Sequence, residues 1–406
     1  MTEDMQLLGW LAGLYAGTWA LGSLVHRARI PMVIIPLYLG VALHIVPGGE
    51  AWVPAETLHL LADLGLLVLM FFIGLELDFR TLVHLPGVAT LTATSIVAPW
   101  LLGTVVVAVA GYDWFVAVFV GLLAAPVAEG VVVPILDEFR LMRSRVGQYV
   151  ISVGAIDDLF EFIVIVAASI WIASQGGRQA FRPEHLIALV SLVLLLVLIS
   201  RFGSKLFAAI PRRATAWVIA CMVLMFLSGF LAEMSEIGMA LGGLLAGLAL
   251  RPHLERAGAN GAAAFDGIAV LAYAAFGPLF FFEVGWNVDL ASLAERPMIA
   301  VGLFLAAVVG KLIAPWPLLR RGRIERREAI VMGVSMTVRM STTLAVADIL
   351  YSRKLLDGDL YSAIVASISL STLLVPVLLT ILVRRWGQDL RMRTAGVPST
   401  EGGDDE

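Results

Sequence analysis

Long apolar segments separated by short polar loops run along almost the whole chain. A helix needs about 20 predominantly apolar residues to cross a hydrocarbon core about 30 Å thick, and the hydropathy pattern predicts thirteen segments of roughly this kind. The predicted spans lie near residues 5–25, 30–46, 58–78, 86–110, 115–137, 146–174, 184–203, 214–234, 237–250, 264–286, 297–319, 327–350 and 360–383. The pattern therefore predicts an all-α polytopic membrane protein with about 13 transmembrane helices.

The composition supports this fold class and excludes an ordinary soluble domain. Hydrophobic residues make up 60% of the chain and charged residues 15%, and the mean hydropathy is +0.91. The single cysteine, Cys221, lies inside a predicted span, so no disulfide framework is expected. The six histidines lie near span ends or in loops, which argues against a histidine-based metal site. We expect no cofactor and no nucleic-acid partner.

The distribution of basic residues predicts the orientation in the membrane. Most of the 28 Lys and Arg residues fall in loops on one side, together with the C-terminal tail. The opposite side carries Arg178, Arg182, Arg296, Arg353 and Lys354. By the positive-inside rule the N-terminus lies outside and the C-terminus in the cytoplasm. We expect a multi-pass protein of a bacterial or archaeal plasma (inner) membrane.

A short internal repeat links the third and tenth predicted spans. Residues Phe71–Asp78 and Phe282–Asp289 both follow the pattern Phe-x-x-Gly-x-x-x-Asp, seven spans apart. An odd offset gives the two copies opposite orientations in the membrane, as in transporters built from inverted repeats. The sequence therefore predicts two inverted-topology repeats.

Two spans carry residues that interrupt a helix at mid-depth, and they are again seven spans apart. The fifth span contains Pro126 and Glu129, and the twelfth contains Thr337, Arg339 and Ser341. Unwound backbone at this depth is tolerated only where it lines a cavity or is buried in protein. We predict two discontinuous crossing helices, whose half-helix dipoles Glu129 and Arg339 could neutralise. The alternative is a simple proline kink with a structural Arg–Glu pair.

The sixth span carries three carboxylates near its middle: Asp157, Asp158 and Glu161. Each costs roughly 2.5–3.5 kcal/mol to insert at the centre of a lone helix. On a helix the two aspartates diverge by about 100°, so they offer two differently aimed acids at one depth. This arrangement suits binding a cation or proton on one acid while the other faces a fixed partner. Glu161, and Glu283 in the tenth span, are auxiliary acids with either a structural role or a place on the ion path.

Lys311 is the only lysine inside a predicted span. Its ammonium could snorkel to the cytoplasmic surface, but it lies nine residues, or about 13 Å, from Arg320, which is too far. An ion pair with an intramembrane carboxylate is the better interpretation, because an unpaired charge at this depth is costly.

These residues carry a resemblance to a known family. The segment Leu64–Asp78, the pair Asp157-Asp158 and the span lysine Lys311 resemble the monovalent cation:proton antiporter-2 family, over approximately residues 29–386. That family includes Kef-type exchangers and bacterial sodium/proton antiporters. The resemblance implies that Asp158 binds the cation or proton, that Asp157 pairs with Lys311, and that an acid pair accompanies electrogenic exchange.

The resemblance also implies a homodimer built from a scaffold and a mobile core. We assign residues 1–57 and 214–262 to the dimerisation scaffold, 58–183 and 263–383 to the ion-translocating core, 184–213 to a linker helix and 384–406 to a cytoplasmic tail. One departure concerns the twelfth span, where many members carry Arg-Gly-Glu but Arg339 is followed here by Met340 and Ser341. Glu129 could then take over as the partner of Arg339.

We expect a secondary transporter and not an enzyme. It would exchange a monovalent cation, with Na⁺ ahead of K⁺ or Li⁺, for protons by alternating access, and so serve pH homeostasis. A sodium-coupled symporter of an organic anion is the alternative, and a sensor without transport also stays open. An intramembrane aspartyl protease is disfavoured, because its two aspartates must face each other from separate helices and adjacent ones cannot.

Overall fold

The structure is a computed structural model that describes most of the chain. The described residues are 3–25, 34–46, 53, 55–76, 85–157, 183–206, 211, 213–235, 238–289, 292–339, 343–344, 347, 350–351 and 356–391. Their named helices are α1 (Glu3–Val25), α2 (Ile34–Ile45), α3 (Ala55–Glu76), α5 (Val88–Val109), α6 (Trp114–Leu122), α7 (Glu129–Glu138), α9 (Pro183–Leu206), α10 (Ala214–Met234), α11 (Met239–Arg256), α12 (Ala259–Val270), the π-helix η4 (Leu271–Phe276), α13 (Gly277–Trp286), α14 (Ser292–Glu295), α15 (Pro297–Ile313), α16 (Trp316–Arg320), α17 (Arg326–Ser335) and α19 (Gly358–Arg391). A further helix covers residues 145–157.

The all-helical fold predicted from the hydropathy pattern is confirmed. The helices follow the predicted spans closely, with α12, η4 and α13 forming one continuous apolar helix over the tenth. Among the described residues, six helices are long and apolar enough to cross a membrane. The structure differs at the last span, where α19 continues to Arg391, well past the predicted end at 383. Only the first part of the sixth span, residues 145–157, is described.

Two pairs of helices pack backbone to backbone, and each pair is centred on a glycine of the repeated motif. Gly74 of α3 lies so close to α11 that a Cβ atom there would overlap the carbonyl oxygen of Leu244. Gly285 of α13 lies equally close to α2, against the carbonyl oxygen of Leu37. The first pair joins predicted spans three and nine, and the second joins ten and two. A seven-span inverted repeat would produce this exchange of partners, so the contacts support the predicted repeat.

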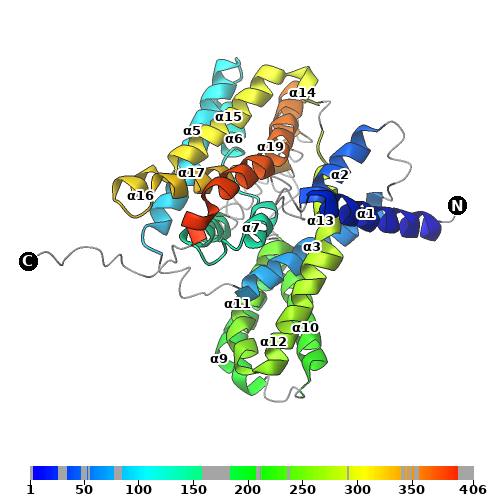
Figure 1. The fold of residues 1–406 in the computed structure, drawn as a ribbon. Helices are drawn as coiled ribbons and strands as arrows, with labels where there is room; N and C mark the ends of the chain where they lie inside the picture. The colour runs from blue at the N-terminus through cyan, green and yellow to red at the C-terminus, as the bar shows by residue number, and fades with distance from the viewer. Residues whose placement is uncertain are drawn as a thin grey trace, which may run out of the picture.

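The helices fall into two packed groups with α7 between them (Figure 1). In one group α5 packs against α6 and α15, and α15 against α17 and α19. In the other α11 packs against α3 and α10, and α9 lies against both α10 and α11. The largest buried apolar cluster draws on both groups, and includes Phe71, Ile135, Val150, Leu244, Phe281 and Met332.

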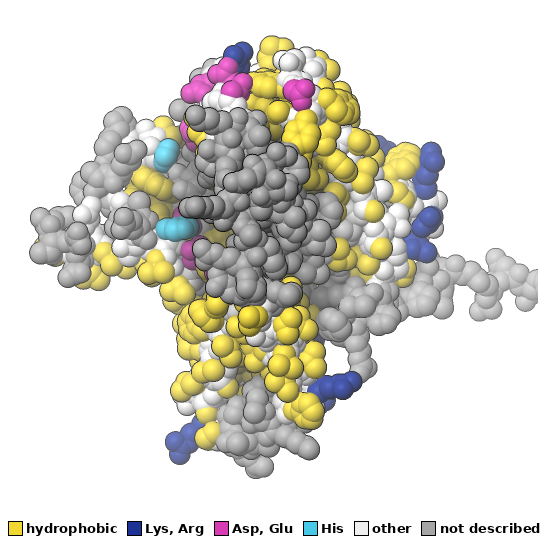
Figure 2. Space-filling view, turned by 180° about the vertical axis from the view of Figure 1, so that it is seen from behind, with side chains coloured by type: hydrophobic (Ala, Val, Ile, Leu, Met, Phe, Trp, Pro, Cys, Tyr) yellow, Lys and Arg dark blue, Asp and Glu magenta, His cyan; other side chains and the backbone are white. Residues whose placement is uncertain are grey.

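The outer surface is strongly apolar, as a lipid-facing surface requires. Figure 2 shows hydrophobic side chains covering much of the surface over the α9–α12 group, with basic side chains near its edge. Exposed large side chains include Val190, Val193, Leu194, Ile219, Val223 and Phe226 on α9 and α10. An apolar surface of this extent is not found on soluble monomers and indicates burial in a membrane.

Candidate functional site

The fifth predicted span is discontinuous, as the sequence predicts. Helix α6 ends at Leu122, α7 begins at Glu129, and the residues between them are not helical. Pro126 explains the break, because proline lacks an N–H for the helix ladder and disfavours helical geometry at the residue before it. The break leaves backbone groups of Ala125, Val127 and Ala128 free to bond to other elements.

A second break lies in the twelfth span, and the two breaks meet. Helix α17 ends at Ser335, and residues 336–339 are not helical. The Ala128 N–H donates to the Val338 carbonyl oxygen at 2.8 Å. This bond joins two segments more than 200 residues apart, so unwound backbone from both spans is buried in protein and satisfied there.

Asp157 is bound to the first unwound segment. It is the last described residue of helix 145–157, and only 1% of its surface is exposed. Its Oδ2 accepts a hydrogen bond from the Val127 N–H at 2.9 Å. Its Oδ1 is also buried and has no hydrogen-bond partner among the described residues. One carboxylate oxygen is therefore held by the broken helix while the other remains available for a cation, a proton or a charged group.

Lys311 of α15 reaches the same unwound segment. Its ammonium donates to the Ala125 carbonyl oxygen, and the residue is fully buried, so it does not snorkel to the surface. Close packing of α15 makes this possible: Gly310 lies against the backbone of Pro99 in α5, leaving no room for a Cβ. Lys311 and Asp157 thus bind backbone groups only two residues apart.

Arg339 is the last described residue of the second unwound segment, and it is buried beside hydroxyl groups of α19. Its Nη2 donates to Ser367 Oγ at 2.5 Å, and its backbone N–H donates to Ser371 Oγ at 3.3 Å. Only 2% of Arg339 is exposed. Its Nε has no partner among the described residues. The Ser367 and Ser371 hydroxyls therefore accept hydrogen bonds from Arg339, for which the sequence suggested an acidic partner.

The remaining predicted site residues have different outcomes. Asp158, Glu161 and Ser341 lie outside the described residues, as does the side chain of Glu129, whose backbone begins α7. Thr337 is buried, and its hydroxyl donates to the Gly333 carbonyl oxygen of the preceding helix α17 at 2.9 Å.

Glu283, the other predicted auxiliary acid, hydrogen-bonds to His59 of α3 at 2.6 Å.

Sequence reasoning missed the groups that bind these charges. The partners are the carbonyl of Ala125, the N–H of Val127 and the hydroxyl of Ser367. Backbone groups carry no signal in a sequence. The one available signal was the run of hydroxyl residues at 367, 369, 371 and 372 in the last span.

Comparison with known proteins agrees with the geometry. The chain is 24% identical over 385 residues to a Na(+)/H(+) antiporter of Enterococcus hirae, covering 92% of this chain and 97% of the relative. It is 24% identical to the Na(+)/H(+)-K(+) antiporter GerN of Bacillus cereus, covering 91% and 94%. A glutathione-regulated potassium-efflux protein KefC of Cronobacter sakazakii is 27% identical, and the match spans 90% of this chain but 60% of that protein.

The fold is shared with a solved transporter structure. The sodium proton antiporter MjNhaP1 of Methanocaldococcus jannaschii at pH 8 matches 98% of this chain and 100% of its own, with a TM-score of 0.63 and 17% identity. The family described as sodium/hydrogen exchanger, transmembrane, matches residues 14–385. The chain is therefore a multi-pass membrane protein that belongs to the sodium/hydrogen exchanger family.

Proposed function

We propose that this protein exchanges a monovalent cation for protons across the membrane by alternating access. The observation that carries the proposal is the meeting of a buried acid and a buried lysine at one unwound segment. Asp157 accepts a hydrogen bond from the Val127 N–H, and Lys311 donates one to the Ala125 carbonyl oxygen. Burying a charge in the membrane is energetically costly, so buried charges there usually mark functional sites. Both groups can also gain or lose a proton when a cation arrives.

In the proposed cycle Asp158 binds the cation or proton, and Asp157 pairs with Lys311. A cation entering beside the acid pair would weaken the pairing, because it competes with the ammonium for the same carboxylates. Lys311 would then release its proton. This coupling makes exchange of more than one proton per cation, and hence electrogenic transport, the expected outcome.

Na⁺ is the first candidate for the cation, with K⁺ and Li⁺ as alternatives. The relatives from Enterococcus hirae and Bacillus cereus are both named for Na⁺ and H⁺, and the second also for K⁺. The comparisons give no support to a sodium-coupled symporter of an organic anion. The proposed role is pH homeostasis.

The protein is proposed to be a homodimer in which a mobile core moves against a dimerisation scaffold. The sequence assigned α3 to the core, and that division stays a prediction. The backbone-to-backbone packing of α3 against α11 favours placing α3 with the scaffold instead. The helices around Lys311 and Arg339, which are α15, α17 and α19, stay with the core.

The decisive test is proton flux in proteoliposomes, with Na⁺, K⁺ and Li⁺ added separately. Asp158→Asn is expected to abolish cation-driven proton movement while the protein still folds and reconstitutes, because an amide carries no titratable proton. Asp266→Asn is the matched control: Asp266 is exposed on α12, and wild-type exchange is expected. Wild-type exchange by Asp158→Asn would overturn the proposal.

Orientation is tested with cysteine labelling, in a background that the chain itself provides. Its single cysteine, Cys221, is buried, so an impermeant thiol reagent should give little signal in intact cells. The N-terminus-outside topology predicts that Ala110→Cys, after α5, is labelled from outside and Arg321→Cys, after α16, is not. Both positions are exposed. The opposite labelling pattern would invert the topology.

A further inference from the structure

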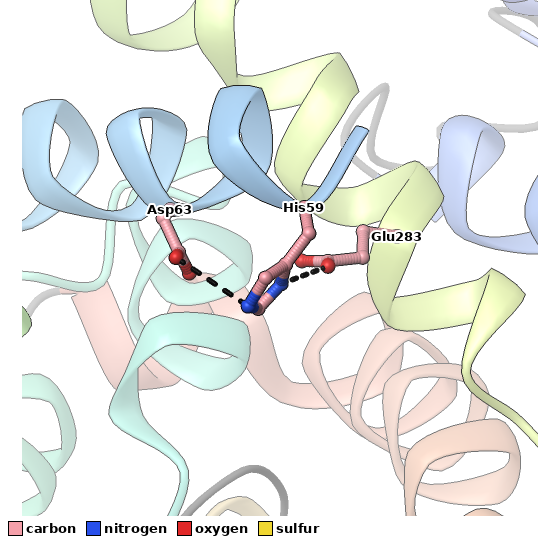
Figure 3. Close-up of side chains that lie close together, drawn as sticks. All are labelled: His59, Asp63 and Glu283. Carbon is pink, nitrogen blue, oxygen red and sulfur yellow. Dashed lines mark hydrogen bonds and ion pairs between the residues drawn. The ribbon is translucent and has the colours of Figure 1, made fainter. Parts of the chain in front are cut away.

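Three titratable side chains that the proposed transport cycle does not use lie together at the start of α3. His59 and Asp63 are one turn apart on α3, and Glu283 reaches them from α13 (Figure 3). Each offers a ligand atom, and these atoms lie within 4.8 Å of one another. Glu283 is 224 residues from His59, so spacing along the chain did not predict the cluster.

The histidine ring has a carboxylate at each nitrogen. Nδ1 lies 2.6 Å from Glu283 Oε1, and Nε2 lies 3.7 Å from Asp63 Oδ2. An ionised carboxylate only accepts hydrogen bonds, so the short contact requires a proton on Nδ1. In a neutral imidazole the lone pair then sits on Nε2, the nitrogen that faces Asp63.

That arrangement matches what a metal-binding histidine needs. Zinc bonds of about 2.0–2.2 Å at near-tetrahedral angles place neighbouring ligand atoms about 3.3–3.6 Å apart, close to the observed 3.7 Å. Metal-ligating histidines almost always donate their other N–H to a carboxylate, which fixes the tautomer and ring orientation. Glu283 is in position to do this, and its side chain is only 10% exposed.

The approach to Nε2 is open. The side chains of His59 and Asp63 are 70% and 36% exposed, so an ion with its water ligands can reach them from outside the helix bundle. The two proposed ligands come from adjacent turns of one helix, where side chains four residues apart face the same way.

We propose that His59 Nε2 and Asp63 form a binding site for a divalent transition-metal ion of the Zn²⁺ type. Glu283 is the positioning residue that orients the imidazole. Water completes the coordination, so the affinity is modest. The site is distinct from the Asp157–Lys311 region and does not depend on the transport proposal.

The test measures the melting temperature of the purified protein in detergent, free of any histidine tag, against Zn²⁺ concentration. Zn²⁺ is expected to raise the melting temperature saturably, because a ligand that prefers the folded state stabilises it. Mg²⁺, which prefers oxygen ligands, is expected to have no such effect.

The variants separate ligands from positioning residue. His59→Gln and Asp63→Asn are expected to lose the Zn²⁺ response. Glu283→Gln is expected to keep it with the midpoint raised about tenfold, because loss of a supporting carboxylate typically weakens metal binding 10–100-fold. His44→Gln is the matched control: His44 contacts the ring of Trp286 on α13 and lies outside the cluster, so its Zn²⁺ response should match wild type.

A second measurement does not depend on stability. Co²⁺ bound through His59 should give a visible ligand-field absorption that Zn²⁺ displaces and His59→Gln abolishes. Two results would overturn the proposal: no Zn²⁺ effect and no Co²⁺ band in wild type, or an unchanged Zn²⁺ midpoint in His59→Gln. If neither metal binds, His59 would serve only as a hydrogen-bonding bridge between the carboxylates of Asp63 and Glu283.

Discussion

Two regions of this membrane protein pack in contrasting ways. Around Gly74 and Gly285 the helices touch backbone to backbone, and the motif glycines allow it. Around the two breaks the chain gives up helical hydrogen bonds and buries three charged residues: Asp157, Lys311 and Arg339. The first region brings backbone against backbone with no side chain between, whereas the second gathers buried charges and unwound backbone.

This contrast indicates that the two regions have different roles, one in holding the helices together and one in the proposed transport. Close packing of small residues is a general means of holding membrane helices together, because lipid supplies no hydrophobic force between them. Buried charges and unwound backbone are costly to bury by comparison, and replacing a whole buried pair with apolar residues is often neutral or favourable. The region of the two breaks is therefore the part that the proposed transport would use, and the close-packed glycine pairs hold the helices around it.

The largest effect is expected from separating the two charges at the first break. On the proposed pairing, Lys311→Gln leaves Asp157 as an uncompensated buried charge, and Asp157→Asn does the converse. Breaking a buried pair on one side typically costs about 3–5 kcal/mol. Combining both changes should restore part of that stability without restoring coupled transport. Thermal unfolding in detergent, arranged as a double-mutant cycle, measures the coupling energy. Simple additivity would mean that Lys311 depends on another partner, with Glu161 as the next candidate.

The close packing at the motif glycines is tested by adding one methyl group. Gly74→Ala and Gly285→Ala should each push a helix pair apart, because the new Cβ meets a carbonyl oxygen of the facing helix. Overpacking of this kind costs about 1–3 kcal/mol or more. The two losses should be similar, since the two glycines occupy equivalent places in the repeat. Gly13→Ala on α1 is the control, because a Cβ there meets nothing within 4 Å. A large loss at only one motif glycine would weaken the case for the repeat.

A smaller effect is expected at the second break. Ser367→Ala removes the hydroxyl that Arg339 Nη2 contacts at 2.5 Å, and a hydrogen bond to a charged group is worth about 1.5–3 kcal/mol. Thr380→Val is the control: it removes a hydroxyl of the same helix that bonds only to the Pro376 carbonyl. The melting temperatures of the two variants give the comparison, and equal losses would show that Ser367 matters for α19 alone.

The smallest effect is expected from a neutral bond between helices. Thr94 of α5 donates to the Ala314 carbonyl at 2.7 Å, just after α15. Hydrogen bonds between membrane helices average about 0.6 kcal/mol, so Thr94→Val should lower stability by roughly this amount. A loss as large as that of Ser367→Ala would mean that charge is not what distinguishes the region of the two breaks.

The sequence predicted the fold class and the helix breaks well, for a physical reason. A hydrocarbon core imposes a minimum apolar length on each span, and Pro126 cannot continue a helix ladder. Lys311 was identified as buried because its distance from the nearest loop exceeds the reach of its side chain. Each of these conclusions depends on local chemistry that single residues carry.

The sequence did less well where partners come from distant parts of the chain. It did not anticipate the Ser367 hydroxyl that Arg339 Nη2 contacts, and its suggested Arg339–Glu129 partnership stays a prediction because the Glu129 side chain lies outside the described residues. It set the histidines aside because they lie near span ends, although His59 meets Glu283 there. It assigned Glu283 either a structural role or a place on the ion path, without a means of finding the residue opposite.

Hydropathy, charge and proline position thus determined by themselves that this chain is a helical membrane protein with breaks and buried charges at mid-depth. Only the tertiary structure decided that the two breaks meet through Ala128 and Val338, and that Asp157 and Lys311 hold the same unwound segment. The physical reason is that an interrupted helix exposes backbone N–H and carbonyl groups, which are the same in every residue. Their partners are chosen by how the helices pack, and the sequence does not mark that choice.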